Sequence, residues 1–476
     1  MKTMHWVPTL ALLCLAAVSN GQDTKTGSEG FDALYGKKQA ATEMLPGKWM
    51  PSIAPNTHPD AQWFRSSALG LFQHWGIVSG SPRGEAWDMR VYTQRNGKEI
   101  PEADLLKRSI PPSQMFERAK IFNPTNYHPE HWMSAASAAG FRYAVLTTRH
   151  HDAYFLGASQ CGDWHAGHYI GRDLIAPWAE ACRQNGIKVG FYFSGPDWYH
   201  GHEYQSYNYP DAKQPPYYNW KHEQVASLSK MPDAVRTEAK SIAHGQLREL
   251  LTKYGKIDLL WPDGGMAGFS VSECRQLQPG MIVGRGFEYA TPEGSEMMKP
   301  EFIKEANRRG YPWELCNIGH GGSWHWSERA EEHGISAASL LTQLAQVRAR
   351  GGVLLLNIAP RPDGEMPHWF YPLCEQLAAW MKTGAEAIYD INVQGPFPYP
   401  DQCAQPVTVG AQAWYVFPGA KPAPVVVKDV SKPASVTLLR NGAAVPFDFA
   451  DRQLTIQLPQ ELRTDLPDVV KIVWAK

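Results

Sequence analysis

The chain has 476 residues, which is too long for one minimal core and allows two or three folded units, one of them a barrel of roughly 250 to 330 residues. Hydrophobic residues make up 43% and charged residues 20%, which excludes collagen-like, coiled-coil and wholly disordered chains. There are 46 Lys+Arg and 47 Asp+Glu, so the formal net charge of -1 gives no reason to expect nucleic acid as the main partner.

The amino end has the pattern of a signal peptide. Lys2 precedes an apolar run over residues 7–18, which is too short to span a bilayer, and the small residues Ser19 and Gly21 follow it. We therefore predict a signal peptide over residues 1–21, export to the periplasm or the medium, and no membrane insertion. No Asn-x-Ser/Thr acceptor occurs, which favours a bacterial product. Residues 22–60 are polar and read as a loosely ordered lead-in.

Seven short apolar runs follow, and helical stretches lie between several of them. This alternation is typical of a parallel sheet buried on both faces, and six or more such units favour a closed (β/α)8-like TIM barrel, here predicted over residues 61–390. The runs cover residues 69–72, 143–148, 188–193, 257–261, 281–283, 313–318 and 353–358. The helical stretches cover residues 178–185, 235–254 and 337–350.

After Tyr389 the helical pattern stops. Residues 406–417, 424–439 and 454–458 read as strands separated by Gly, Pro and Asn-Gly turns, so residues 391–476 are predicted to form a small β-sandwich. Once Cys14 leaves with the signal peptide, the six remaining cysteines are scattered without a CxxC pair, which implies neither a disulfide framework nor a zinc cluster.

In a barrel of this kind the loops at the carboxyl ends of the strands build the active site. Polar side chains do follow the apolar runs. They are His74, His150-His151-Asp152, Ser194, Asp197, Asp263, Arg285, Asn357 and Asp363.

Asp263 is the clearest of these candidates. It ends the run 257–262, and Gly264 and Gly265 follow it and let a ligand or another backbone approach closely. Asp258 opens the same run and should lie at the opposite, stabilising face of the barrel, where a cap or turn role suits it.

Glu314 lies between Trp313 and Leu315 within an apolar run. Such surroundings raise the pKa of a carboxyl, as a general acid requires, although a strand glutamate paired with an arginine would have the same neighbours. One ionised and one protonated carboxyl on facing strands, Asp263 and Glu314, are the equipment for glycoside cleavage, and we expect the two to meet across one pocket.

Two other classes of function stay open. His150, His151 and Asp152 could serve a metal-dependent hydrolase, but consecutive strand residues point to opposite faces, and hydrogen bonding to a sugar is the favoured reading. A catalytically idle carbohydrate-binding protein is the second alternative, and the presence of both carboxyls argues against it.

The order of several motifs resembles the α-L-fucosidases of glycoside hydrolase family 29, from about Trp63 through the β module. The matching stretches are residues 63–64 (WF), 70–76 (GLFQHWG), 146–152 (LTTRHHD), 172–174 (RDL), 190–194 (GFYFS), 254–264 (YGKIDLLWPDG), 291–293 (TPE), 313–316 (WELC), 352–358 (GVLLLNI) and 384–389 (GAEAIY).

This resemblance implies a (β/α) barrel followed by a β-sandwich. It also implies hydrolysis of terminal α-L-fucosyl linkages with retention of configuration, on fucosylated oligosaccharides or glycoconjugates, without a metal or organic cofactor. Asp263 matches the family's nucleophile, and Glu314 matches the residue that protonates the leaving oxygen and then activates water. The positions that match the sugar-binding residues are His74, Trp87, His150, His151, Tyr192, Trp261 and Arg285.

The chain departs from the family pattern at three places. Where many relatives read Glu-Trp-Tyr, it has Glu85-Ala86-Trp87-Asp88, so Trp87 is expected to keep its place while the contact of Glu85 is open. Gly284 replaces an Asn before Arg285. The usual Ser-Trp-Gly-Tyr reads Ser323-Trp324-His325-Trp326 here, and leaving-group preference is the property most exposed to that change.

Overall fold

In the computed structural model of this chain, the described residues are 53–95, 98–107, 109–209, 212–291 and 300–475. The predicted signal peptide and most of the predicted lead-in lie outside them. No helix within these ranges is long and apolar enough to cross a membrane.

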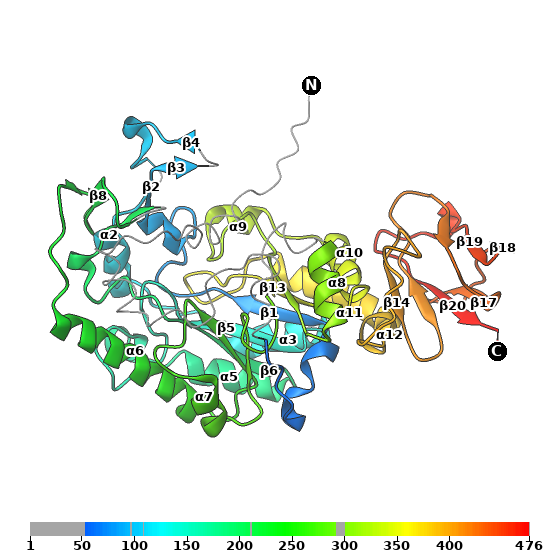
Figure 1. Cartoon of the computed structure of the whole chain (residues 1–476), viewed down its shortest axis with the longest axis horizontal. Coiled ribbons are helices and arrows are strands. Elements are labelled where there is room, and N and C mark those ends of the chain that lie inside the picture. Colours follow the sequence, from blue (N-terminus) through cyan, green and yellow to red (C-terminus); the bar gives the residue numbers. More distant parts are fainter. Residues whose placement is uncertain (1–52, 96–97, 108, 210–211, 292–299, 476) are drawn as a thin grey trace.

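All seven predicted apolar runs form strands, and all seven belong to one parallel sheet with the order β11-β10-β6-β5-β1-β13-β12 (Figure 1). The runs are continuous because the strands are covered on both faces. The strands are β1 (Leu69–Gln73), β5 (Tyr143–Arg149), β6 (Lys188–Ser194), β10 (Leu259–Asp263), β11 (Ile282–Val283), β12 (Glu314–Ile318) and β13 (Val353–Asn357).

The sheet curls until its two edge strands almost meet. Ala290 forms a parallel bridge with Trp313, and the Glu314 N–H donates to the Ala290 carbonyl at 2.8 Å. Next to it, the Glu288 N–H donates to the carbonyl of Val283 at the end of β11. Seven strands and this short bridge therefore form the ring within the described residues, in place of eight full strands.

Helices lie around the outside of the curled sheet (Figure 1). The three predicted helical stretches correspond to α5, α6 and α10, with ends that differ by a few residues. The helices are α2 (Pro112–Glu117), α3 (Pro129–Ala138), α4 (Ala166–Tyr169), α5 (Ile175–Gln184), α6 (Asp233–Lys253), α7 (Val271–Leu277), α8 (Pro300–Arg308), α9 (Glu328–Glu332), α10 (Ala337–Arg348), α11 (Phe370–Gly384) and α12 (Glu386–Tyr389).

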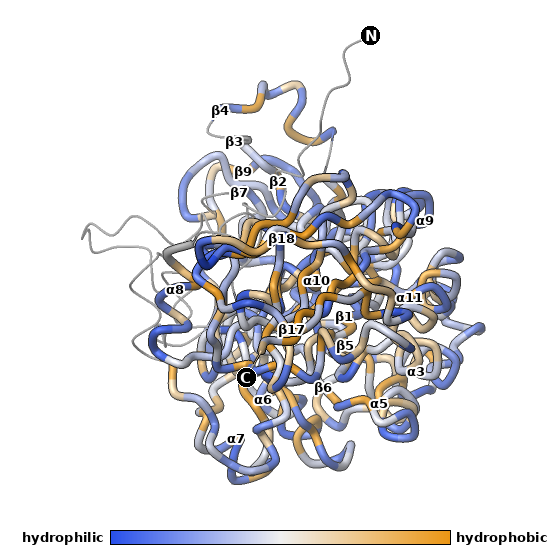
Figure 2. Tube along the Cα trace, turned by 90° about the vertical axis from the view of Figure 1, so that its right-hand side faces the viewer, coloured by the Kyte–Doolittle hydropathy of each residue, from blue (hydrophilic) through white to orange (hydrophobic). Residues whose placement is uncertain are grey.

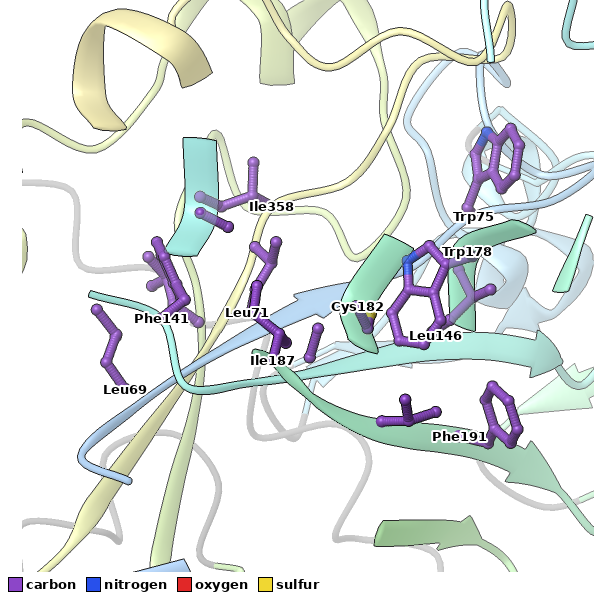
Figure 3. Packing of buried hydrophobic residues seen from close by; sticks show 14 of the residues in the cluster. Leu69, Leu71, Trp75, Phe141, Leu146, Trp178, Cys182, Ile187, Phe191 and Ile358 are labelled. Atoms are coloured by element: carbon purple, nitrogen blue, oxygen red, sulfur yellow. The ribbon is translucent and has the colours of Figure 1, made fainter. Parts of the chain in front are cut away.

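Alternate strand residues feed two separate cores. Leu69 and Leu71 of β1 belong to the outer core together with Trp178 and Cys182 of α5, and in Figure 3 Leu69 lies toward Phe141 and Leu71 toward Cys182. Phe72 points inward, into a smaller aromatic cluster inside the ring. In Figure 2 the hydrophobic stretches run through the interior and the hydrophilic ones lie at the periphery. The inward positions of the strands are therefore the ones that can present chemistry inside the barrel.

The carboxyl-terminal unit lies to one side of the barrel (Figure 1). It consists of a four-stranded sheet with the order β14-β15-β20-β17 and a three-stranded sheet with the order β16-β19-β18, packed on a shared apolar core. This is the expected β-sandwich. Its strands are β14 (Val407–Val409), β15 (Trp414–Val416), β16 (Val425–Val427), β17 (Pro433–Leu438), β18 (Phe447–Ala450), β19 (Gln453–Ile456) and β20 (Val470–Trp474).

The six cysteines of the described part are free thiols. Short strands in the loops complete the fold. The short strands are β2 (Val91–Tyr92), β3 (Gln94–Arg95), β4 (Lys98–Glu99), β7 (Asn208–Tyr209), β8 (Tyr217–Tyr218) and β9 (Gln224–Val225). Asp258, at the amino end of β10, accepts the Val189 N–H at 2.9 Å and pairs with Lys188 at 3.3 Å, which is the structural role expected for it.

Candidate active site

Asp263 is the last residue of β10, and its side chain remains 19% exposed at the carboxyl end of the strand ring. Three side chains surround its carboxylate. Tyr192 of β6 donates its hydroxyl to Oδ2 at 2.7 Å, His151 Nε2 lies 3.5 Å from the same oxygen, and an Arg285 terminal nitrogen lies 3.3 Å from Oδ1. The carboxylate is thus held in a fixed orientation by groups from three separate chain segments.

These neighbours also keep Asp263 ionised. Burial by itself would raise the pKa of Asp263, but the positive charge of Arg285, with His151 and the Tyr192 hydrogen bond, brings the pKa below its usual value of 3.8. Burial lowers the pKa of His151 to about 4, so this imidazole is neutral near pH 7 and Arg285 supplies the charge. An ionised carboxylate at a barrel mouth is suited to act as a nucleophile.

Arg285 follows β11 in a left-handed backbone conformation, with φ of 53°. Its guanidinium lies 4.7 Å from the centre of the Trp261 ring while it pairs with Asp263. Gly284 is required before it, because a Cβ at that position would lie 2.4 Å from the Tyr289 hydroxyl. The space that an Asn would need is therefore occupied by Tyr289 in this chain.

His74, just after β1, is oriented by Asn357 at the end of β13. Its Nδ1 lies 2.7 Å from the Asn357 amide oxygen, which can only accept, so Nδ1 carries the hydrogen. The Asn357 amide nitrogen donates to the Trp324 carbonyl at 2.7 Å, in agreement with that orientation. Burial lowers the pKa of His74 to about 3, which leaves a neutral ring whose Nε2 accepts a hydrogen bond from a ligand.

His150 and His151 follow β5, where His150 contacts Tyr192 and His151 contacts Asp263. The His150 ring stacks on Tyr192 with centroids 5.4 Å apart, and its Nδ1 is buried without a hydrogen-bond partner. The His151 Nδ1 lies 2.7 Å from the Ser194 hydroxyl oxygen. Trp87 packs edge-on against His151 at 5.5 Å and is half-buried, so the structure brings it next to the histidines.

Glu314 is inside the ring but not beside Asp263. It is the first residue of β12, whereas Asp263 is the last residue of β10, so the two carboxyls lie at opposite ends of parallel strands. Tyr143 donates to Glu314 Oε2 at 2.7 Å, and Trp261 and Tyr289 donate to Oε1 at 3.0 and 3.2 Å. The side chain has no exposed surface.

The expected meeting of Asp263 and Glu314 in one pocket is therefore not what the structure contains. Burial raises the pKa of Glu314 to about 7, against the three hydrogen bonds, which lower it. This is the protonation behaviour that the apolar neighbours suggested. Glu314 does not lie where it was expected, in a pocket shared with Asp263, because Trp261 and the aromatic cluster around it separate Glu314 from the mouth of the barrel. Here the carboxyl orients the Trp261 indole on which Arg285 packs.

A second buried carboxyl lies on the loop after β1. Glu85 Oε1 accepts the Trp324 N–H at 2.7 Å, and burial raises the pKa of Glu85 well above its usual value. Its residue is 7% exposed, in contrast to Glu314. The contact of Glu85, which the sequence did not define, is thus a hydrogen bond to the backbone of Trp324. This backbone lies beside His74, whose ring centre is 4.9 Å from that of Trp324.

The third residue of the alternative metal set points elsewhere. Asp152 Oδ1 accepts the Tyr154 N–H at 2.9 Å, within its own turn. Across residues 53–475, outside the undescribed gaps, there is no group of three or more His, Cys, Asp and Glu side chains placed to hold a metal ion. His150, His151 and Asp152 therefore do not form a common ligand set.

Sequence reasoning missed Tyr143 and Tyr289, which bind Glu314 from the start of β5 and from the loop after β11. Tyr143 had a detectable signal, because Gly70 on the neighbouring strand leaves the space for its ring: a Cβ there would lie 2.2 Å from it. Tyr289 had none, since its position depends on the left-handed turn at Arg285.

Comparisons with known proteins all find the same family. The family model described as Alpha-L-fucosidase matches residues 39–386. The chain is 24% identical to tissue alpha-L-fucosidase of Bos taurus over 358 residues, which cover 71% of this chain and 70% of that protein. It is 26% identical to plasma alpha-L-fucosidase of Homo sapiens over 369 residues, 74% of this chain and 72% of that protein.

Solved structures give the same result. Alpha-L-fucosidase isoenzyme 1 from Paenibacillus thiaminolyticus has a TM-score of 0.66 at 26% identity, covering 88% of this chain and 99% of that one. A GH29 alpha-L-fucosidase from Bacteroides thetaiotaomicron, described as a trapped covalent intermediate with 2-fluoro-fucosyl fluoride, shares the fold with a TM-score of 0.66 at 19% identity, covering 90% and 99%.

Proposed function

This chain belongs to the alpha-L-fucosidase family, and from that premise we propose that it is an exo-acting glycoside hydrolase that releases terminal α-L-fucose with retention of configuration. The observation that carries the proposal is the setting of Asp263, an ionised carboxylate held by Tyr192, His151 and Arg285 at the carboxyl end of the strand ring. Retention is supported by the Bacteroides relative, whose structure is that of a trapped covalent intermediate.

In the first half-reaction an oxygen of Asp263 attacks the anomeric carbon while the bond to the aglycone oxygen breaks, and the leaving oxygen takes a proton from an acidic side chain. A fucosyl ester of Asp263 results. In the second half-reaction water attacks the same carbon, the ester bond breaks, and the group that gave its proton takes one from the water. Two inversions at one carbon give net retention.

The remaining residues position the sugar. His74 Nε2 is an acceptor, because Nδ1 carries the hydrogen, so His74 accepts from a hydroxyl rather than donating to one. His150 and His151 hydrogen-bond other hydroxyls, and Trp261 offers its apolar surface to the C6 methyl group. Trp87 covers the sugar from the rim.

The proton donor has two candidates, since a carboxyl acid needs a raised pKa and access to the leaving oxygen. Glu314 has the first property, and the family resemblance assigns the role to it. Glu85 has the raised pKa, and 7% of its residue surface is exposed. A leaving-group series, argued in the Discussion, separates them.

A screen on the purified full chain tests the proposal. It would use an aryl α-L-fucoside beside α1,2-, α1,3-, α1,4- and α1,6-linked fucosyl oligosaccharides, with the matching α-galactoside and β-fucoside as controls. We expect release of fucose whose first-formed anomer is α by NMR, unchanged after exhaustive chelation. No release from any fucoside, a β product, or loss of activity on chelation would overturn it.

The substrate class follows from the same argument, as fucosylated oligosaccharides or glycoconjugates. Export through the amino-terminal signal is part of this proposal too, because the apolar run behind Lys2 has signal-peptide length. Mass spectrometry of the mature protein from a cell fraction tests it: an amino terminus at or near Gln22 supports cleavage, and an intact Met1 contradicts it.

A further inference from the structure

His325 occupies the position where the related motif has glycine, and two loops hold it in place. It forms a parallel bridge with His74, and its N–H donates to the Gly84 carbonyl at 2.9 Å. Gly84 has φ of 67°, and a Cβ there would lie 2.3 Å from the His325 carbonyl oxygen, so the two backbones are in direct contact. On the other side of the contact, Glu85 holds the Trp324 N–H.

The imidazole of His325 is buried, with 1% of the residue exposed, and neither of its ring nitrogens has a hydrogen-bond partner. Its ring centre lies 5.4 Å from that of His74 and 4.9 Å from that of His150, edge to face in both cases. The Nδ1 of His150 is also buried and unpartnered. A buried nitrogen without a hydrogen-bond partner costs free energy. Three such nitrogens on two neighbouring rings, two on His325 and one on His150, therefore indicate that a bound polar group pairs with them.

The chemistry of the three rings limits what the bound group can be. Burial lowers the pKa of His74, His150 and His325, so all three are neutral near pH 7. His150 and His325 each carry one N–H and one lone pair, whereas the N–H of His74 is donated to Asn357 and only its Nε2 lone pair is free. A group that both donates and accepts fits this arrangement, as a water or a sugar hydroxyl does. His74 and His150 are the sugar-binding positions of the proposed function, so the hydroxyl of a bound fucosyl group can reach the same place.

We propose that His325 is a specificity-determining residue that hydrogen-bonds one hydroxyl of the fucosyl group together with His150. This rests on the proposed function and deepens it. Because glycine in the related motif has no side chain, this contact is one that the chain adds, and it makes that hydroxyl a stricter requirement.

The test uses an aryl α-L-fucoside and its 2-deoxy, 3-deoxy and 4-deoxy analogues with the full chain. His325→Phe keeps the ring volume but removes both nitrogens, and His325→Gln keeps a donor and an acceptor. We expect His325→Phe to lower kcat/KM on the fucoside by about 10- to 100-fold, and to change it little on the one analogue that lacks the contacted hydroxyl. His325→Gln should recover most of the loss.

His244→Phe is the matched control, because His244 is stacked on Phe269 at 4.2 Å, on a helix outside the strand ring. It should leave all four substrates unchanged. Fucose affinity measured by calorimetry gives a second readout, in which His325→Phe should weaken binding by a similar factor. This readout also serves if the chemical step is slow.

An equal loss of activity on all four substrates would mean that His325 only supports the fold, and no loss at all would mean that it does not touch the sugar; either overturns the inference. If His325→Phe fails to fold, His325→Gly, which removes the side chain as in the related motif, is measured on the same four substrates and decides in the same way. A wild-type chain inactive on every fucoside would instead contradict the proposed function.

Discussion

The hydroxyl of Tyr192 donates to Oδ2 of Asp263 at 2.7 Å, across the neighbouring strands β6 and β10. The two residues are not partners in strand register, since Tyr192 pairs with Trp261 and Asp263 with Ser194. The tyrosine thus reaches one inward layer along the barrel to orient the carboxylate. The contact joins the aromatic cluster inside the ring to the group proposed to react.

Replacing Tyr192 by Phe should lower kcat/KM by about 10- to 100-fold, because a hydrogen bond to a charged group contributes about 1.5 to 3 kcal/mol. The ring would keep its stacking on Trp261 and His150, so fucose affinity should change less than kcat. Steady-state kinetics measure both. Tyr254→Phe is the control, because it removes a like bond of 2.8 Å to Asp173 away from the site; equal losses in the two variants would contradict the prediction.

Replacing Asp263 by Gly should reduce turnover at least about a thousandfold, since the nucleophile is removed while the pocket remains. Azide can then attack the anomeric carbon from the vacated side. A single displacement inverts configuration, so the product should be the β-fucosyl azide, identifiable by NMR. Asp258→Asn is the control on the same strand: it should lower stability without lowering turnover, and azide should have no effect on it. Azide-independent activity of Asp263→Gly would refute the assignment.

The pH profile should depend on Arg285. Wild-type kcat/KM should hold down to about pH 4, because the pKa of Asp263 lies below 3.8 and the ionised form is the active one. Arg285→Gln removes the positive charge that stabilises the carboxylate, so the acid limb should move up by about 1 to 3 pH units. Arg452→Gln, at an exposed left-handed position in the sandwich, is the control. An unmoved acid limb in Arg285→Gln would show that another group controls it.

The positions of the strands along the chain and the location of the mouth could be predicted because both depend on local patterns. Buried parallel strands are continuous apolar runs, and the residue that follows each run lies at the carboxyl end of the sheet. Asp263 was found in this way. The same rule applied to Glu314, the second residue of a six-residue run, would have placed it at the amino end, where the structure has it.

The partners of these carboxyls could not be predicted, because they depend on tertiary contacts between distant segments. Tyr192 reaches Asp263 across 71 residues of chain, and Tyr143 reaches Glu314 across 171. Apolar neighbours in sequence indicated a raised pKa for Glu314, but Trp261 and the aromatic cluster that bury it also separate it from the mouth of the barrel. Local sequence reports the environment of a side chain better than its accessibility.

A series of aryl fucosides with dinitrophenyl, nitrophenyl and unsubstituted phenyl leaving groups should identify the acid. A variant that has lost the proton donor slows most on the poorest leaving group, because that oxygen depends most on protonation. From its closed position, Glu314→Gln should lower kcat/KM by a similar factor throughout. Glu85→Gln is the matched variant, since Glu85 has a raised pKa and is 7% exposed, whereas Glu314 is not exposed. A steep dependence for Glu314→Gln and a flat one for Glu85→Gln would return the acid role to Glu314.

Glu314 should also make the stability of the protein depend on pH. Its pKa is about 7 in the folded chain and near 4.5 when exposed, so the folded state holds a proton that the unfolded state releases between these values. Wild type should therefore be most stable, relative to Glu314→Gln, below pH 4.5, and should lose up to about 3 kcal/mol of unfolding free energy against that variant by pH 7. Above pH 7 the difference should stay constant. Urea unfolding from pH 4 to 8 measures it, and parallel curves for the two proteins would mean that Glu314 is already ionised in the folded state at acidic pH.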